Sequence, residues 1–186
     1  ADLLGLLTGF VIDLVDVDAD PGYSREVEAS ETFSRTLPVS GQSTFRVEGA
    51  NGSVDVWGIP GAHQVTVEAV RRVKSDSRRD AQTHLADLQV SIESRPSEFV
   101  VKTQQPRTSQ GRTYIVDYHI PLPAHFRVKL ANGNGSVRMV GVWGDVVAQN
   151  GNGDVELSLS SIEELPYVMG LIRQSFERQM GNGLDS

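Results

Sequence analysis

Three aspartates near the N-terminus have the spacing of a calcium-binding loop. Asp16, Asp18 and Asp20 place carboxylate oxygens at alternate positions, an arrangement that a hard divalent cation prefers. The pattern fails further along, because an EF-hand needs glycine at its sixth position and Pro21 stands there. The twelfth position, where a bidentate glutamate is required, is Val27. The sequence therefore favours a solvated acidic turn and predicts no metal site.

Acids and histidines elsewhere also lack the spacing that catalysis needs. A carbohydrate-active enzyme would need two carboxylates converging in a cleft, and nothing pairs Asp145, Asp154 and Glu156, the acids closest to the repeat described below. The four histidines show no H-E-x-x-H spacing, and the chain has neither a G-x-S-x-G elbow nor a Walker loop. The sequence predicts no catalytic residue, no cofactor and no enzymatic activity.

Two groups of side chains could bind a ligand without catalysing a reaction. Trp57 and Trp143 each stand in a Val-Trp-Gly, where the indole either binds from an exposed position or packs at the edge of the core; packing is favoured. Five basic residues could receive a carboxylate or phosphate, although the solvated face of a helix is the simpler interpretation. They are Arg71, Arg72, Lys74, Arg78 and Arg79.

The elements that must position these side chains are organised around a unit written twice. Each copy opens with Asn-Gly-Asn-Gly, at 132–135 and 150–153, so the unit returns after 18 residues; a looser copy lies at 51–58. Asparagine and glycine tolerate positive φ and mark sharp turns. The alternating strands that follow predict outward positions for Arg138 and Glu156. The inward positions are Val137, Met139, Val155, Leu157 and Leu159.

A fixed period of this length favours a solenoid whose rungs stack on one another. Stacking would bring Asn134 beside Asn152, where the amide side chains can form a ladder. The alternative is two consecutive hairpins of an antiparallel sheet, because Asn-Gly between alternating apolar runs is also a strong hairpin signal.

The pattern NGSVDVWG, a helical insert, and then NGNGSVRMVGVWGDVVAQNGNGDVEL resembles the DUF4097 family of bacterial adhesin-like β proteins. The resemblance covers about residues 43–160. It implies a right-handed β-helix-like or β-roll fold, usually outside the cytoplasm or attached to the envelope. It supplies no catalytic residues.

The chain before the repeat also has the pattern of a mainly β protein, with one inserted helix. Residues 23–42 are polar and predict either a linker or an edge strand. The stretch Ser75–Gln89 changes to helical spacing, and Asp76 or Ser77 could cap its start. Alternating strands are expected at 44–48, 54–59, 64–73 (with Val65, Val67 and Ala69 inward), 88–92, 99–101 and 114–120.

These patterns divide the chain into an N-terminal apolar segment with an acidic linker (1–42), a β-repeat domain (43–160) and a C-terminal amphipathic helix (161–186). The apolar run at 3–15 is too short and too interrupted to span a membrane. The helix carries a heptad-like apolar stripe, which either caps the open end of the β core, the favoured interpretation, or docks on a protein partner. The stripe consists of Ile162, Leu165, Met169, Ile172 and Phe176.

Composition narrows the class of protein further. The 186 residues carry a net charge of −7, which argues against unspecific binding to nucleic acid or anionic lipid. There is no cysteine, so disulfides and thiolate metal sites are excluded. The start at Ala1 fits a cleaved signal peptide or a trimmed chain equally well. We therefore expect a non-enzymatic, extracytoplasmic bacterial protein that presents a binding surface; the alternative is a structural accessory subunit of an envelope or membrane complex, docked through its terminal segments.

Overall fold

The computed structural model describes residues 26–158, and strands dominate them. One short helix, α1 (Arg78–His84), continues into a 3-10 turn, η1 (Leu85–Asp87). The predicted calcium loop, the apolar run at 3–15 and the predicted C-terminal helix lie outside the described residues. The strands are β1 (Val27–Pro38), β2 (Thr44–Glu48), β3 (Val54–Ile59), β4 (Gln64–Ser75), β5 (Gln89–Ser94), β6 (Glu98–Gln104), β7 (Thr113–Pro123), β8 (Arg127–Asn134), β9 (Val137–Val140), β10 (Val146–Asn152) and β11 (Val155–Ser158).

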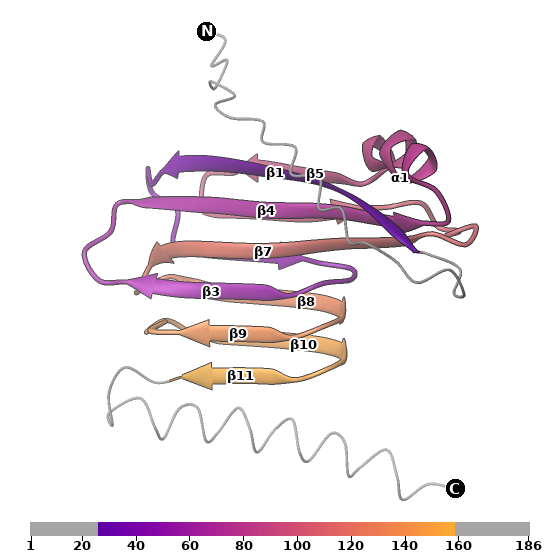
Figure 1. The fold of residues 1–186 in the computed structure, drawn as a ribbon. Helices are drawn as coiled ribbons and strands as arrows, with labels where there is room; N and C mark the ends of the chain where they lie inside the picture. The colour runs from indigo at the N-terminus through magenta and orange to yellow at the C-terminus, as the bar shows by residue number, and fades with distance from the viewer. Residues whose placement is uncertain (1–25, 159–186) are drawn as a thin grey trace, which may run out of the picture.

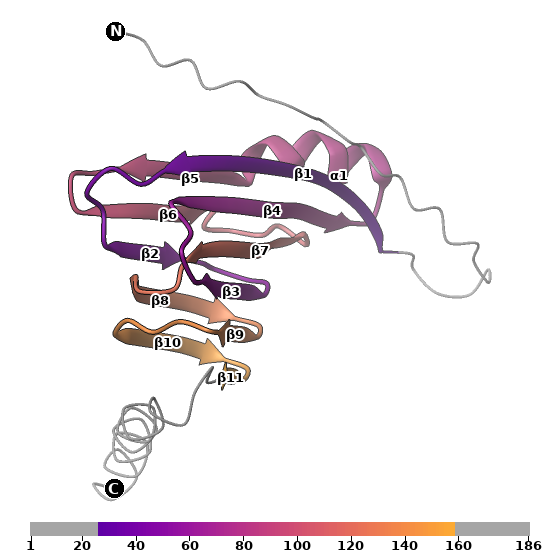
Figure 2. The ribbon, with the colours of Figure 1, turned by 90° about the vertical axis from the view of Figure 1, so that its left-hand side faces the viewer.

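The strands form two mixed sheets that face each other (Figures 1 and 2). The six-stranded sheet has the order β1-β4-β7-β3-β9-β11, and the five-stranded sheet has the order β10-β8-β2-β6-β5. Strict alternation along the strands sends valine, leucine and phenylalanine side chains between the sheets, where Phe99 and Phe126 stack with ring centroids 6.4 Å apart. The prediction of a mainly β protein is confirmed.

One half of the molecule consists of parallel levels, each contributing one strand to each sheet. In the five-stranded sheet β2, β8 and β10 run parallel, and in the six-stranded sheet β3, β9 and β11 do the same. Val146 pairs with Val128 and Val155 with Val137, so the 18-residue sequence period is also the spacing between levels. These parallel pairings exclude the alternative of two antiparallel hairpins.

The turns between the two strands of a level stack as closely as the strands do. Gly52, Gly135 and Gly153 all have positive φ, between +109° and +125°. A Cβ on Gly135 would lie 2.1 Å from the Gly52 carbonyl oxygen, and one on Gly153 would lie 2.2 Å from that of Gly135, so only glycine fits. Beside this glycine column, Asn152 Nδ2 donates to Asn134 Oδ1 at 2.7 Å, which confirms the predicted amide ladder.

The other half carries the helix, and the pairings within it, β1–β4, β4–β7 and β5–β6, are antiparallel. It joins the first half through two further parallel pairings, β6 with β2 and β7 with β3. β1 pairs with β4 over its whole length and is the edge strand of its sheet, so of the two interpretations of residues 23–42 the structure shows the edge strand over 27–38. The Ser77 side chain caps α1 by accepting from Asp80 N at 3.2 Å, as predicted. The helix is shorter than predicted. The chain changes to the 3-10 turn η1 at Leu85, and Leu88 connects that turn to β5.

The predicted inward positions of the repeat are only partly correct. Val137 and Met139 are buried, and Arg138 and Glu156 point outward, as expected. Val155, in contrast, is 44% exposed, and Leu157 is only half-buried. The physical reason is position: β11 is the end strand of its sheet, so among the described residues its side chains contact a parallel level on one side only. Leu159 lies outside the described residues.

Candidate binding face

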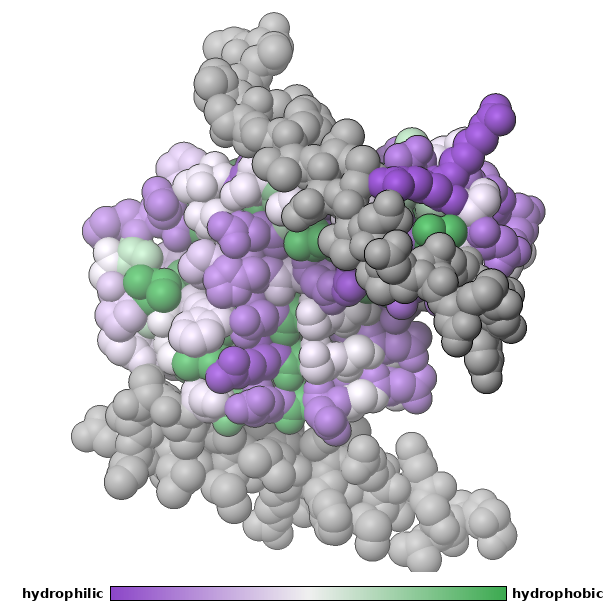
Figure 3. Space-filling model, in the orientation of Figure 1, coloured by the Kyte–Doolittle hydropathy of each residue, from purple (hydrophilic) through white to green (hydrophobic). Residues whose placement is uncertain are grey.

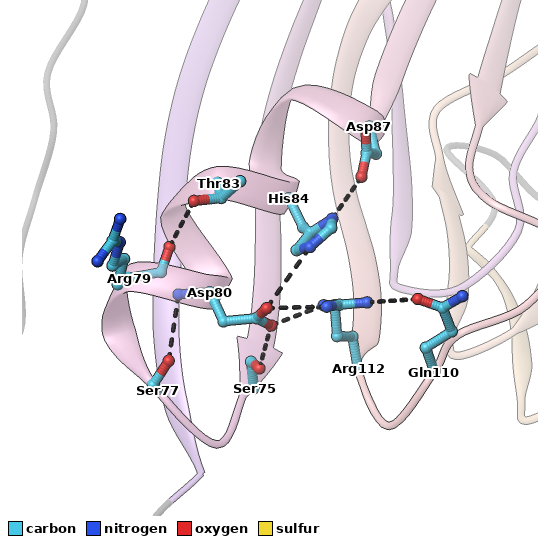
Figure 4. A network of polar contacts seen from close by, with 9 residues as sticks. All are labelled: Ser75, Ser77, Arg79, Asp80, Thr83, His84, Asp87, Gln110 and Arg112. Carbon is cyan, nitrogen blue, oxygen red and sulfur yellow. Dashed lines mark hydrogen bonds and ion pairs between the residues drawn. The ribbon is translucent and has the colours of Figure 1, made fainter.

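The most connected polar cluster lies at α1 (Figure 4). Arg112 donates to both carboxylate oxygens of Asp80, from Nε at 2.6 Å and from Nη2 at 2.8 Å, and Ser75 Oγ donates to the same carboxylate. These hydrogen bonds, those from Arg112 first, hold the pKa of Asp80 well below its usual value. His84 contacts Asp80 at 3.5 Å and Asp87 at 2.6 Å.

This cluster joins the helix to the sheet and has no catalytic arrangement. Nucleophilic catalysis would need the serine hydroxyl within reach of the histidine, but Ser75 donates to Asp80 instead. Arg112 stands in the connection between β6 and β7, so its pairing with Asp80 fastens α1 to that connection. We interpret the cluster as structural.

The predicted basic cluster is divided between β4 and α1, and two of its five residues, Arg71 and Arg72, are paired with acids. Arg71, Arg72 and Lys74 belong to β4, so they are not part of a helix face, which corrects the prediction. Arg71 pairs with Glu31 on β1 and donates to the Leu88 carbonyl oxygen at 2.6 Å, whereas Arg72 pairs with Asp117 on β7. These two paired guanidinium groups hold β1, β4 and β7 together.

An aromatic and charged surface lies on the outer face of the six-stranded sheet, centred on β3. Asp55, Trp57 and Ile59 alternate with buried valines and therefore point outward. Strand register places His119 and Pro121 of β7 on one side of them, and Arg138 and Val140 of β9 on the other. These seven residues are called the Trp57 face below.

Contacts within the Trp57 face converge on the indole. The Arg138 guanidinium carbon lies 5.6 Å from the centroid of the Trp57 ring, a cation–π distance, and the His119 ring centroid lies 6.3 Å away. His119 Nδ1 also contacts Asp55 Oδ2 at 3.4 Å, and Arg138 contacts Glu156 on β11 at 3.8 Å. The contacts join β7, β3, β9 and β11 into one continuous row of charged groups beside an aromatic ring.

Two polar atoms of the Trp57 face have no hydrogen-bond partner. They are the indole Nε1 of Trp57 and Oδ1 of Asp55, and both are shielded from solvent. Most buried polar atoms in folded proteins are hydrogen-bonded, so an unpaired donor and an unpaired acceptor two residues apart are unusual. Because both atoms are shielded, they are a local irregularity of the Trp57 face and do not themselves contact a ligand.

Apolar groups extend the Trp57 face toward the end of the strands. Ile59 is 41% exposed and Trp143 is 53% exposed. Ala124 joins them, since its N–H donates to the Ile59 carbonyl and its own carbonyl accepts from Trp143 N. Figure 3 shows hydrophobic residues among hydrophilic ones on this side of the molecule, some of them near the ends of β3 and β9. The prediction that both tryptophans pack in the core edge is therefore wrong for Trp143, and Trp57 is half-buried.

The remaining sequence candidates do not form a site. Asp145 pairs with Arg127 at 2.7 Å and Glu156 with Arg138, so the acids near the repeat do not converge. Within residues 26–158 no group of three or more histidine, aspartate or glutamate side chains could hold a metal ion. The predicted docking residues Ile162, Leu165, Met169, Ile172 and Phe176 lie outside the described residues.

Sequence reasoning identified Trp57 and Arg138 separately, but not the face that joins them. His119 lies 64 residues from Asp55 in the chain, and only the register of β3 against β7 brings the two together. The available signal was alternation, which was used to place Arg138 on the outer side. Applied to 51–58 it would also have placed Asp55 and Trp57 outward, but packing was favoured for Trp57.

Comparisons with known proteins give partial likenesses to solved structures. No protein-family model and no curated protein matches the chain, so the resemblance to the DUF4097 family rests on its sequence motifs alone. A "putative cell adhesion protein" from Clostridium sporogenes is 13% identical with a TM-score of 0.44, over 70% of this chain and 63% of that one. A "putative adhesin" from Parabacteroides merdae is 9% identical with a TM-score of 0.29, over 69% and 52%. A "putative lipid binding protein" from Parabacteroides distasonis is 11% identical with a TM-score of 0.25, over 69% and 62%.

The chain thus spans between 52% and 63% of the length of these three structures. TM-scores of this size describe a partial overlap and transfer neither function nor ligand. No helix among residues 26–158 is long and apolar enough to cross a membrane.

Proposed function

We propose that this protein is a non-enzymatic, adhesin-like β protein that binds a partner molecule through the Trp57 face. The observation that carries the proposal is the aromatic surface itself, a half-buried indole under a guanidinium with the exposed Ile59 on the same strand. Tryptophan and arginine are the residue types most enriched at the energetic centres of binding surfaces.

The geometry favours binding over catalysis. The Trp57 face is an open strand surface in which acids are matched by basic groups, Asp55 by His119 and Glu156 by Arg138. A hydrolytic site would instead need two carboxylates converging on one bond from the walls of a cleft. The proposal includes an extracytoplasmic location in a bacterium, supported by the resemblance of residues 43–160 to envelope-associated proteins; fractionation of the native cells with an antibody tests it.

The binding proposal is tested by probing immobilised glycans and extracellular matrix proteins with the labelled chain. We expect saturable binding to at least one of them, weakened about tenfold or more by Trp57→Ala, because loss of a central aromatic typically costs 2 kcal/mol or more of binding energy. Arg35→Ala on β1 is the matched control, since Arg35 is exposed on a different strand. Thermal unfolding of each variant separates loss of binding from loss of fold.

Absence of binding to every immobilised component, or binding that Trp57→Ala leaves unchanged, contradicts the assignment of the Trp57 face. Arg138→Ala is a second variant on an exposed position, in case Trp57→Ala unfolds the chain. It removes the guanidinium over the indole without removing the ring.

We infer further that the three parallel levels are the rungs of a β-roll-like repeat and that the end formed by β10 and β11 is covered. Both strands end their sheets on the same side, where unpaired edges are normally covered or blunted. The predicted apolar stripe at 162–176 follows β11 directly in the chain and is the candidate cover.

The same open end favours a second candidate function, that of an accessory subunit whose terminal segments dock on a larger envelope complex. Deleting 161–186 distinguishes the two roles of the stripe. If the stripe is a cap, the melting temperature of the deleted chain falls; if it is a docking element, melting is nearly unchanged and co-purification of a partner is lost. Unchanged melting with unchanged association contradicts both.

A further inference from the structure

A shallow groove crosses the outer face of the five-stranded sheet, on the side of the molecule away from the Trp57 face. Its volume is about 270 Å³, and it spans β2, β8 and β10. The side chains that form it point outward, because their neighbours Val47, Leu130 and Val146 are buried. They are Arg46 and Glu48 of β2, Lys129 and Ala131 of β8, and Val147 and Gln149 of β10.

Two cations stand side by side at one end of the groove. Arg46 pairs with Lys129 in strand register, so the two side chains leave adjacent strands about 4.8 Å apart. Like charges directly opposite each other in a sheet are destabilising. Nothing among the described residues relieves this pair fully: Lys129 has no carboxylate within ion-pair distance, and Arg46 reaches only Glu98, at 3.3 Å.

Arg46 also has an unsatisfied donor. Its Nε is shielded from solvent and has no hydrogen-bond partner, although a buried guanidinium nitrogen is normally paired. The next row of the sheet differs, because there Lys102 is neutralised by Glu48 at 3.5 Å. This end of the groove is therefore basic, because Lys129 has no acidic partner among the described residues and Arg46 is paired with Glu98 only. The unpaired Nε does not by itself indicate a ligand, since Nε of Arg71 and of Arg72 is unpaired in the same way.

Each of the two rows of the groove contains one apolar side chain: Val147 completes the row of Arg46 and Lys129, and Ala131 stands in the row of Glu48 and Gln149. Val147, in register with Lys129, is 50% exposed, and Ala131 is exposed beside it. Ala131 lies between Glu48 and Gln149 in register, and its single methyl group leaves the hollow between these longer side chains. The carboxylate and amide of this row stand about 7 Å along the strands from the two cations.

We propose that this groove binds a sugar acid, a single pyranose ring that carries a carboxylate. The carboxylate would lie between Arg46 and Lys129, where charge-assisted hydrogen bonds are strongest. One apolar C–H face of the ring would pack on Ala131 and Val147, and ring hydroxyls would donate to Glu48 and pair with Gln149. An inorganic anion would contact only the two cations and would make no contact with Ala131 and Val147.

The proposal is independent of the Trp57 face, because the two surfaces lie on different sheets and share no residue. It is tested by calorimetric titration of the full chain with sodium glucuronate, with glucose and with sodium sulfate. We expect saturable binding of glucuronate, no binding of glucose, and binding of sulfate at least about tenfold weaker, since sulfate lacks the ring contacts. Equal binding of glucuronate and sulfate, or no binding of glucuronate, overturns the proposal.

Variants locate the site within the chain. Lys129→Gln should weaken glucuronate binding about tenfold or more, whereas Arg35→Gln, which removes an exposed cation from β1 of the other sheet, should leave it nearly unchanged. Ala131→Leu should abolish binding without changing charge, because the larger side chain fills the hollow. Both tested positions are outward-facing, so folding should survive, and unfolding curves check this. Glucuronate binding that Lys129→Gln and Ala131→Leu leave intact places the ligand elsewhere and contradicts the proposal.

Discussion

The parallel and antiparallel halves of this protein reach the same two-sheet architecture by different means. The parallel half, from β2–β3 down to β10–β11, repeats one turn: glycine against glycine carbonyl, asparagine amide against asparagine amide. The antiparallel half has no repeated turn and is joined by individual contacts, such as Arg71 with Glu31 across β4 and β1, and Arg112 with Asp80 at the helix. The parallel half is therefore held in register mainly by the backbone of a few turns. The antiparallel half depends on many separate side-chain contacts.

The largest effect is expected from a single methyl group in the glycine column. Gly135→Ala places a Cβ 2.1 Å from the Gly52 carbonyl oxygen and also strains a residue with φ of +117°. Since neither level can move without breaking its strand pairing, we expect a loss of more than about 4 kcal/mol in the free energy of unfolding. Gly61→Ala is the matched control: its φ is +71° and nothing lies within 4 Å of the added Cβ, so only about 1–2 kcal/mol should be lost. Equal losses in a urea titration would show that the column does not set the spacing of the levels.

Truncating core side chains should have a smaller effect on the free energy of unfolding. The loss should decrease from β9 to β11. Met139 and Leu157 are in register on adjacent parallel strands, but Met139 is buried and Leu157 half-buried. Met139→Ala should therefore cost about 3 kcal/mol. Leu157→Ala should cost about 1 kcal/mol, because less of its apolar surface leaves water on folding. If thermal and chemical unfolding gave the two variants the same loss, the inference that the stack is less tightly packed at β11 would be wrong.

The asparagine ladder should matter less than the glycine column beside it. Asn152→Ala removes the donor to Asn134 Oδ1 at an exposed position, so water can replace the lost hydrogen bond. We expect a loss of about 1 kcal/mol, measured by urea unfolding. Asn134→Ala removes the acceptor of the same hydrogen bond, and a similar loss in both variants would identify that bond as the cause.

The smallest effect is a pH dependence specific to the antiparallel half. The pKa of Asp80 in the folded protein is lowered, chiefly by its hydrogen bonds to Arg112, relative to about 3.9 in an unfolded chain. Its contribution to stability is therefore fully present above the unfolded pKa and is lost as the pH falls below about 4 toward the folded value. Arg112→Gln should flatten this acid limb of the stability profile, measured by unfolding from pH 6 downward. An unchanged acid limb in Arg112→Gln would assign the dependence to other carboxylates.

The two halves also differ in how far the sequence predicts them. In the parallel half, the Asn-Gly spacing predicted the period, the ladder of Asn134 and Asn152 and the buried positions of Val137 and Met139. Local spacing sufficed because each contact repeats one made a fixed number of residues away. Val155 was misplaced because periodicity alone does not show which copy stands at the end of a sheet.

In the antiparallel half the strands could be predicted, but their partners could not. Alternation identified β4 and β7, yet nothing local shows that Arg72 meets Asp117, 45 residues later. The Trp57 face depends on both kinds of information, since Arg138 comes from the repeat, whereas His119 comes from the parallel pairing of β7 with β3, which no local pattern predicts. The groove with Arg46 and Lys129 was missed for the same reason, because these two cations are ordinary surface residues until the register places them together.

The stacked turns also bear on how this protein ages. Asn-Gly is the dipeptide most prone to deamidation, because the unhindered glycine nitrogen attacks the preceding side-chain amide and closes a succinimide ring. In the stack, Gly52 N donates to the Asn134 carbonyl and Gly135 N to the Asn152 carbonyl, which holds both nucleophiles away from that reaction. The hydrogen bonds between stacked turns thus protect Asn-Gly pairs that would deamidate in a free peptide. Succinimide formation at Asn51 and Asn134 requires the levels to separate first.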